Sequence, residues 1–396
     1  MQMKIETVTL IAALAATAAG SGGPAQAAIP ASSLQPRTGA SSPASFLLTG
    51  VSCASAVSCT AVGAAYYSDP HSPAGSQAPV AMRWNGKTWA LQHAPNPTRD
   101  DGSTLAAVSC PGPGDCVAVG DHGGYGNDGT LAEAWNGKTW VTQPTPLSHG
   151  IITGLDGVSC TSPAACTAVG YRSTAAGHLL TLSMSWNGKA WVTQHTPNPP
   201  GDSNQLFGVS CTSARACTAV GSSAAGALAM RWNGKSWSVQ HTVEPPGGPG
   251  FLAGVSCDSG THCVAAGNNN ANEGAGPSIH TVAEVWNGTT WALQPTPNPA
   301  RHDAAFLNGV SCVSGQACAA AGWYASSAGT LTSADRWNGR RWALQASPNP
   351  PEAFDELWAI SCTSAKSCTA VGNDGNSTLA ERWNGATWAV TSTPNP

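Results

Sequence analysis

The sequence predicts an all-β fold, a seven-bladed β-propeller with four antiparallel strands in each blade and one disulfide within each blade. Three observations lead to this prediction. A pattern of about 50 residues recurs seven times between Phe46 and Pro396. Each copy holds two cysteines six positions apart and a Trp-Asn-Gly-x-x-Trp segment. No helical periodicity separates the copies, so each copy must fold as a small sheet that packs against its neighbours.

Each copy contains four strand-like runs, which we name a, b, c and d in chain order. In the first copy they cover residues 48–53, 59–63, 80–84 and 87–92. Asn85-Gly86 joins runs c and d, and this dipeptide is typical of type I′ hairpin turns, which need positive φ at both central positions. The register that follows places both tryptophans of a copy on one face of the c–d hairpin. Each blade should therefore have one apolar surface formed by its two tryptophans.

The cysteines predict one disulfide per blade. All 14 cysteines belong to the repeated pattern, and a chain bound for an oxidising compartment would pair them. Cysteines directly opposite each other on the a–b hairpin lie within disulfide distance. A single Cys-x5-Cys per copy, without regular histidines, does not supply the four ligands of a zinc site. The expected pairs are Cys53–Cys59, Cys110–Cys116, Cys160–Cys166, Cys211–Cys217, Cys257–Cys263, Cys312–Cys318 and Cys362–Cys368.

The N-terminal residues predict secretion. Residues 1–27 hold an early lysine, an apolar run and an Ala-x-Ala cleavage pattern, as in a signal peptide. Residues 28–45 form a leader whose second half resembles an inter-blade linker. It could close the junction of blades seven and one as a clasp, or remain a disordered leader. Residues 46–396 form the propeller, and no second apolar segment reaches membrane length.

Composition argues against nucleic acid as a partner. Only 10% of the residues are charged, and the net charge of -4 shows no focus along the chain. A surface coated with Ser, Thr, Asn, Gln and Gly has little to offer phosphates and suits neutral ligands such as glycans. We expect a secreted, extracellular monomer that needs no cofactor and does not insert into membranes.

The repeat also resembles known propeller families. Its period and strand order are similar to kelch repeats, although the double glycine that ends the second kelch strand is reduced to Val62-Gly63. The segment from Trp84 to Trp89 resembles, less closely, the Asp-box turn of sialidase-type propellers and the tryptophan-docking turn of quinoprotein propellers, but lacks the Asp-box aspartate. The whole repeat is most similar to secreted, mostly uncharacterised propeller proteins of high-GC Gram-positive bacteria. This resemblance implies the fold and carries no activity with it.

The loops predict where a ligand would bind. Up-and-down strand order puts the short a–b and c–d turns on one side of the ring, the turn face, and the variable b–c and d–a connections on the other, the loop face. Two tryptophans lie outside the repeated pairs, and both belong to the loop face. An aromatic platform with acidic and amide groups there would suit a sugar ring. The candidate residues are Trp323, Tyr324, Trp358, Asp355, Glu356, Asn373 and Asp374.

An alternative interpretation of equal weight is that Trp358 plugs the central channel and Trp323 packs on it. Weaker mixed clusters on the loop face are typical of solvated loops. They are Tyr66, Tyr67, Asp69 and His71; Asp121, His122 and Tyr125; and Arg301, His302 and Asp303. His93, His195 and His241 recur at one position of run d and are expected to be scaffold surface.

These observations favour a binding protein over an enzyme. A copper-radical oxidase needs a free cysteine for its cofactor, and this chain has none to spare. A sialidase-type site needs a cluster of arginines, but several arginines of this chain belong to the repeated hairpin. We predict that the loop face binds an extracellular glycan or a surface polymer without changing it chemically. Three alternatives stay open: a hydrolase or lyase using acids such as Asp156, Asp355 or Asp374; a protein–protein scaffold; and a lectin with repeated sites at the tryptophan pairs.

Overall fold

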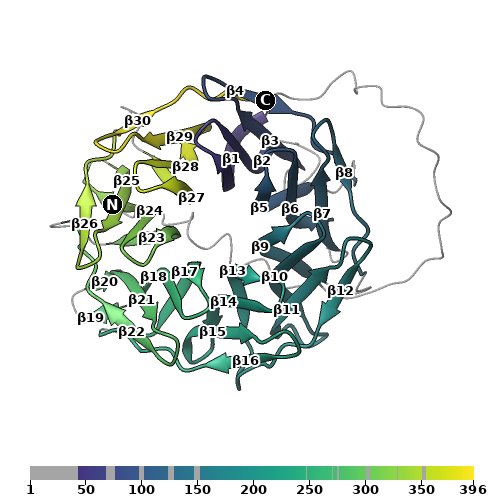
Figure 1. Cartoon of the computed structure of the whole chain (residues 1–396). Helices are drawn as coiled ribbons and strands as arrows, with labels where there is room; N and C mark the ends of the chain where they lie inside the picture. Colours follow the sequence, from purple (N-terminus) through teal and green to yellow (C-terminus); the bar gives the residue numbers. More distant parts are fainter. Residues whose placement is uncertain are drawn as a thin grey trace.

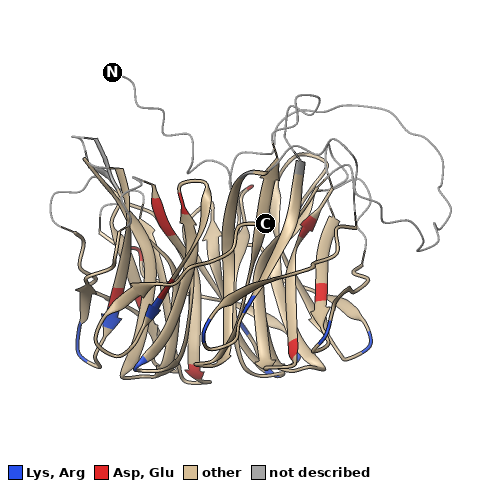
Figure 2. Cartoon of the chain, turned by 90° about the horizontal axis from the view of Figure 1, so that it is seen from above, with Lys and Arg blue, Asp and Glu red and all other residues tan. Residues whose placement is uncertain are grey.

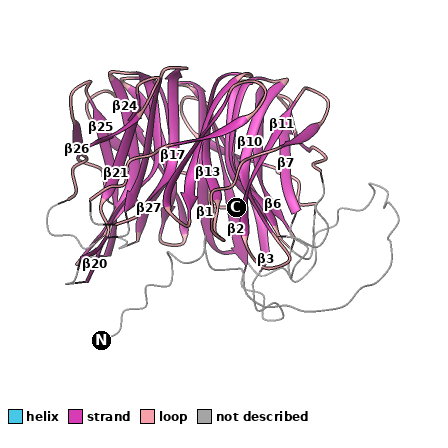
Figure 3. Ribbon diagram, turned by 90° about the horizontal axis from the view of Figure 1, so that it is seen from below, coloured by secondary structure: helices cyan, strands magenta, loops and turns pink. Residues whose placement is uncertain are grey.

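A computed structural model describes residues 43–67, 76–97, 102–123, 129–146, 152–246, 248–269, 271–273, 276–299, 304–327, 329–349 and 354–396. These residues form seven four-stranded antiparallel sheets arranged in chain order around a common axis, which confirms the predicted propeller (Figure 1). Strand a of every blade is innermost and strand d is outermost. A side view shows the strands running between the two faces of the disc (Figure 3).

The strands of blades one to four are β1 (Pro43–Ser55), β2 (Ser58–Tyr67), β3 (Ser76–Trp84), β4 (Trp89–Gln92), β5 (Ser103–Gly112), β6 (Asp115–His122), β7 (Gly129–Trp135), β8 (Trp140–Thr142), β9 (Thr153–Ser162), β10 (Ala165–Ser173), β11 (Leu179–Trp186), β12 (Trp191–Gln194), β13 (Gln205–Ser213), β14 (Ala216–Ser223), β15 (Gly226–Trp232) and β16 (Trp237–Gln240). Those of blades five to seven are β17 (Gly250–Ser259), β18 (His262–Asn269), β21 (Thr281–Trp286), β22 (Trp291–Gln294), β23 (Ala305–Ser314), β24 (Ala317–Ser326), β25 (Gly329–Trp337), β26 (Trp342–Gln345), β27 (Asp355–Ser364), β28 (Ser367–Asp374), β29 (Ser377–Trp383) and β30 (Trp388–Val390). Blade five also carries a small hairpin of β19 (Ala271–Glu273) and β20 (Gly276–Ser278).

Asn-Gly turns join strands c and d as predicted, but they are longer than the expected two-residue type I′ turn. In blade one, residues 85–88 form the loop, the Asn85 N–H donates to the Thr88 carbonyl at 3.2 Å, and strand d begins at Trp89 rather than at Lys87. In blade one the Asn85 carboxamide oxygen accepts the backbone N–H groups of Lys87 and Thr88, both at 2.9 Å, and Gly86 has φ of 96°. The turn pairs Trp84 with Trp89, whose ring centroids lie 5.7 Å apart. A glycine is needed here because L side chains rarely adopt such a φ.

The disulfides also form as predicted, one per blade and each between cysteines six positions apart. The glycine four residues after the second cysteine recurs for a different structural reason. A Cβ at Gly221 would lie 2.0 Å from the Gln205 carbonyl oxygen, and one at Gly322 would lie 1.8 Å from that of Phe306. The backbone of strand a therefore excludes any side chain at this position of strand b, which explains the repeated Val/Ala-Gly.

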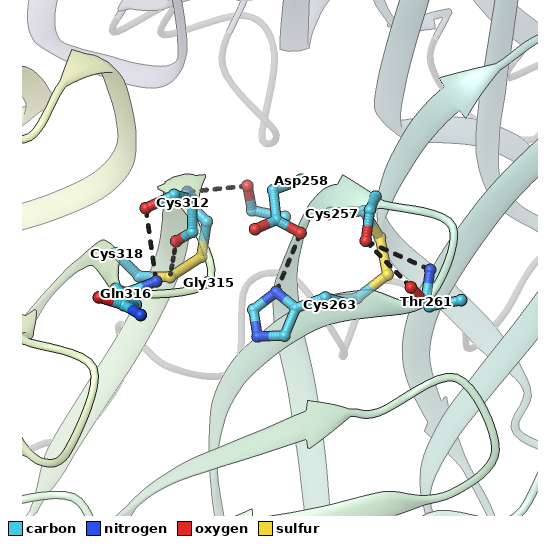
Figure 4. Close-up of polar contacts among 12 residues, drawn as sticks. Cys257, Asp258, Thr261, Cys263, Cys312, Gly315, Gln316 and Cys318 are labelled. Atoms are coloured by element: carbon cyan, nitrogen blue, oxygen red, sulfur yellow. Dashed lines mark hydrogen bonds and ion pairs between the residues drawn. A yellow bond between two sulfur atoms is a disulfide. The ribbon is translucent and has the colours of Figure 1, made fainter.

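A ring of serine hydroxyls joins the innermost strands. In every blade the Ser that precedes the first cysteine accepts a hydrogen bond from the backbone N–H of the first cysteine in the next blade. Figure 4 shows the bond donated by Cys312, beside two of the disulfides. The donor–acceptor pairs are Cys110–Ser52, Cys160–Ser109, Cys211–Ser159, Cys257–Ser210, Cys312–Ser256, Cys362–Ser311 and Cys53–Ser361, at 2.9 to 3.0 Å. The Val/Ile-Ser-Cys motif is thus explained by inter-blade bonding.

We predict that Ser210→Ala lowers the free energy of unfolding by about 1 to 3 kcal/mol, because it leaves the N–H of Cys257 without its acceptor in a shielded interface. Chemical denaturation measures this. Ser238→Ala, on the exposed outer strand of the same blade, serves as the control and should change stability by less than about 0.5 kcal/mol. Equal effects in the two variants would remove the serine ring as a stabilising element.

The ring closes between blades seven and one without an exchanged strand, because each of these blades contains all four of its own strands. Arg382 donates to the Ala56 carbonyl at 2.6 Å, and Phe46 N–H donates to the Asn376 carbonyl at 3.0 Å. The predicted signal peptide, and all of the predicted leader except residues 43–45 at the start of β1, lie outside the described residues. The clasp therefore stays a prediction.

The repeated tryptophans pack between blades. The second tryptophan of each copy is buried, and in several blades its indole N–H donates to a glutamine of the preceding blade, as Trp237 does to Gln194 at 3.0 Å. Trp140, Trp191 and Trp342 donate to Gln92, Gln143 and Gln294 in the same way. At the closure Trp89 donates to Thr391 at 3.3 Å. These contacts favour packing over repeated sugar sites as the reason for the pattern.

Buried acids occupy one position of strand c, two residues before its tryptophan. This position is methionine in blades one, three and four, and Glu133, Glu284, Asp335 and Glu381 in the others. All four acids are at most 1% exposed. Burial raises the pKa of Glu133 to about 8 and the pKa values of the other three to about 7. The hydrophobic pattern does not predict these buried acids, although the seven copies carry either methionine or an acid at this one position.

Candidate functional site

A β-bulge in every innermost strand sets the geometry near the loop face. Four residues before the first cysteine, one residue of strand a has no partner on strand b, and the pairing shifts by one position. A bulge turns a side chain away from the regular sheet. The residue that follows is Gly or Ala, where the innermost strands of neighbouring blades approach closely. The bulge residues are Thr49, Ala106, Asp156, Phe207, Ala253, Asn308 and Trp358.

Trp358 is thus the bulge residue of blade seven. Its indole N–H donates to the Asn373 side-chain oxygen at 3.1 Å, and Asn373 is the cross-strand partner of Glu356. Burial raises the pKa of Glu356, while a hydrogen bond from Trp358 opposes that rise. The structure therefore brings together three of the predicted site residues as one bonded group, with the Trp358 ring half-buried.

Trp323 lies within strand β24 and is packed against Phe306. The repeat pattern predicts that Trp323 begins the b–c loop of blade six, but β24 continues through it, and it pairs with Phe306 and Thr332. Its ring stacks on Phe306 at 4.0 Å between centroids and is 8% exposed. Tyr324 follows on the same strand and is half-buried. The Trp323 ring is a packing element here, because its face is already covered.

Asp355 and Asp374 are direct cross-strand partners at the loop end of blade seven. Asp355 is fully buried and lies on the same side of β27 as Leu357, which packs against blade six. Asp374 is half-buried. Phe354, just before β27, is 64% exposed. The loop end of blade seven thus combines one exposed aromatic ring, one half-buried indole and several carboxyl groups.

A second polar cluster lies across blades one to four. The bulge residue Asp156 accepts a hydrogen bond from the Gln205 amide at 2.9 Å. Desolvation, with the Asp121 charge as a smaller cause, raises the pKa of Asp156 to about 7 despite that hydrogen bond. Thr104 donates to Asp121. Desolvation and the same Asp121 charge raise the pKa of Tyr66. The Asp121 charge therefore acts on both Asp156 and Tyr66, although the three residues come from three blades.

This cluster joins residues that sequence analysis had placed in separate groups. Tyr66 and Asp121 were assigned to solvated loops, whereas both lie in strands, β2 and β6. The common position of Asp156 and Trp358, four residues before a cysteine, could have revealed the ring of bulge residues. Asp69, His71, Tyr125, Arg301, His302 and Asp303 lie outside the described residues.

Within the described ranges, no three His, Cys, Asp or Glu side chains are grouped so that they could hold a metal ion. The same part of the chain contains no helix with the length and apolar character needed to cross a membrane.

Comparison with known proteins supports the fold. No protein-family model matches the chain, and no curated protein matches it. Among solved structures, it is similar to a polysaccharide lyase described as a PL25 ulvan lyase, with a TM-score of 0.59, 10% identity, and coverage of 89% of this chain and 98% of the lyase. A GH74 xyloglucanase from Xanthomonas campestris aligns at a TM-score of 0.52 and 13% identity over 87% of this chain and 54% of the enzyme. The chain thus spans about half of that enzyme.

The protein U3-55K aligns at a TM-score of 0.52 with 11% identity, over 82% of this chain and 88% of that protein. At such identities, likeness extends to the propeller fold and no further. Function has to be argued from the site itself.

Proposed function

We propose that this protein is a secreted, monomeric binding protein whose loop face holds an extracellular glycan or surface polymer without changing it. The observation that carries the proposal is the group formed by Trp358, Asn373 and Glu356. The exposed Phe354 precedes Glu356 by two residues at the same end of blade seven. An indole ring offers a face on which a sugar can stack, and carboxylate and amide groups bond sugar hydroxyls. Seven disulfides point towards an oxidising extracellular compartment.

A glycan and cell-wall binding screen of the protein, with variants beside it, tests this proposal. Trp358→Ala should lower affinity for the bound glycan by about tenfold or more, the loss expected for a stacking aromatic residue worth 1 to 2 kcal/mol. Trp358→Phe should retain part of the binding, because it keeps a ring but loses the hydrogen bond to Asn373.

Val57→Ala is the control, since Val57 is 60% exposed on the turn face. Trp323→Ala should mainly lower stability, because its ring is buried against Phe306. Undiminished glycan binding by a folded Trp358→Ala protein would eliminate this site.

A second candidate function is cleavage of a polysaccharide by the cluster of Asp156, Asp121 and Tyr66. A carboxyl group that stays protonated near neutral pH beside a second acid is the arrangement used for general acid–base work. The ulvan lyase and the xyloglucanase are propellers that act on polysaccharides, which makes carbohydrate chemistry on this fold reasonable.

Product release from a panel of polysaccharides distinguishes the two candidates. If the cluster is catalytic, Asp156→Asn should lower the rate by about 100-fold or more and remove one limb of the pH–rate profile. Trp358→Ala should then affect mainly substrate affinity. Binding without product release at any pH would favour the first candidate.

A further inference from the structure

Charges are separated between the two faces of the disc. Among the described residues, every lysine and arginine except Arg172 lies at the turn face, as the blue segments of Figure 2 show. Most acids outside the buried strand-c position lie at the loop face, among them Asp121, Asp156, Asp355 and Asp374. The net charge of -4 therefore conceals a basic face and an acidic face. This finding corrects the expectation of an unfocused charge.

The basic side chains occupy repeated positions. The residue after Asn-Gly is lysine in each of the four consecutive blades one to four, and Arg340 and Arg341 extend the set in blade six. All of these side chains are exposed. Their turns are held rigidly, because the preceding asparagine accepts the backbone N–H of each lysine at 2.9 to 3.0 Å. The four lysines are Lys87, Lys138, Lys189 and Lys235.

Four arginines form an inner layer of fixed positive charge on the same face. Each guanidinium lies over a tryptophan of the next blade and donates to a backbone carbonyl in that blade's a–b turn. Arg336, for example, lies 4.6 Å from the ring centroid of Trp383 and 2.7 Å from the Ala365 carbonyl. Such stacked guanidinium groups are held in place before any partner arrives. The others are Arg83, Arg231 and Arg382.

Few acids oppose this charge. Within the described residues the acids at the turn face are Asp115 and Asp258. Asp258 is already engaged, since His262 contacts it at 3.0 Å (Figure 4). Among the described residues, no acid forms an ion pair with these exposed lysines, so their charge is directed to solvent.

We propose that the turn face is a docking surface for a linear polyanion of repeated phosphate groups. Exposed cations on consecutive blades form an arc that a flexible polymer can follow. Such a polymer can bind along the surface, so it needs no enclosed pocket. Lysines at turn tips act as point charges, so they fit closely spaced anions without demanding one geometry. Docking through the turn face leaves the loop face, where the proposed glycan site lies, accessible.

The test measures binding of the full protein to immobilised inorganic polyphosphate and to polygalacturonate. Binding to either probe should weaken steeply between 50 and 300 mM salt, because bound counterions are released and screening increases. Polyphosphate should bind more tightly than polygalacturonate, and the reverse order would overturn the assignment of repeated phosphate groups. Absence of binding to both probes at 50 mM salt would overturn the proposal.

The decisive variant replaces Lys87, Lys138, Lys189 and Lys235 by glutamine. Its affinity for the bound probe should fall by about tenfold or more, with a shallower salt dependence. The matched control changes net charge equally on the other face, by Ala175→Glu, Ala176→Glu, Ala224→Glu and Ala225→Glu in exposed b–c turns. Near-wild-type binding by this control supports the face-specific site. An equal loss in both variants would show that only net charge matters and would contradict the proposal.

Discussion

Raising the pH from 5 to 8 should destabilise this protein markedly. Glu133, Glu284, Asp335 and Glu381 have pKa values of about 7 to 8 in the folded chain. In the unfolded chain these groups ionise near pH 4 to 4.5. Between these limits the folded state binds more protons than the unfolded state, so the free energy of unfolding falls as pH rises. The stabilisation is complete below about pH 4 and is lost as pH passes through 7 to 8.

The largest single effect belongs to Glu133. Neither of its carboxylate oxygens has a hydrogen-bond partner within the described residues, so burial alone causes the shift. Ionising it inside the blade interface should cost on the order of 3 to 5 kcal/mol at pH 8. The expected observation is a melting temperature that is highest on the acidic side and declines towards pH 8.

The chain supplies its own matched replacement. Because Met82, Met184 and Met230 fill the same position in other blades, Glu133→Met should fold, raise stability at pH 8 and flatten the pH dependence. Exposed Asp202→Asn serves as a charge control and should leave the profile unchanged. A melting temperature that rises steadily from pH 5 to 8 would contradict the assignment of these acids as buried and protonated.

Trp237→Ala should lower the free energy of unfolding by roughly 3 to 5 kcal/mol, the range observed when a large core aromatic residue is truncated. Trp237 is 5% exposed, packs with Trp232 and Leu206, and bonds Gln194 of the preceding blade. Urea denaturation, monitored by tryptophan fluorescence, measures this change in the free energy of unfolding. Trp237→Phe should cost less, because it loses the hydrogen bond and part of the ring area only.

The same variant decides whether the tryptophan pairs are sugar sites. If Trp237→Ala melts like the unchanged protein and nevertheless loses glycan binding, the repeated-lectin alternative gains and the packing explanation fails. Loss of stability with glycan binding retained in the folded fraction would place the pairs in the scaffold.

Local signals made the fold predictable. The Asn-Gly turns, the paired cysteines and the pair of tryptophans recur with the same spacing, and each fixes a contact within one blade. The serine ring was hidden because Ser52 and Cys110 belong to different blades, and a repeat pattern does not say which copies touch at which atom. The buried acids were hidden for a related reason, since a carboxyl group at a core position contradicts the usual hydrophobic pattern.

The site was predictable only in part. Pairing across β27 and β28 follows from the repeat register, so Glu356 and Asn373 could be placed together. The position of Trp323 depended on where β24 ends, and strand boundaries next to variable loops are weakly encoded. The cluster of Tyr66, Asp121 and Asp156 could not be predicted from the sequence, because its three residues belong to three blades. Their proximity depends on how the three neighbouring sheets twist and pack. The charge separation could be predicted only after each charged residue had been assigned to the turn face or the loop face.

Closure by lateral contacts gives each blade an independence that a shared strand would remove. A blade contains all four of its strands and its own disulfide, and at the inner ring it offers one serine acceptor to the next blade and one cysteine N–H to the previous one. Duplication or deletion of one coding repeat therefore adds or removes a whole sheet without separating any strand from the strands it pairs with. Such a gene can lengthen its b–c and d–a loops one blade at a time, while the joints of the ring stay interchangeable.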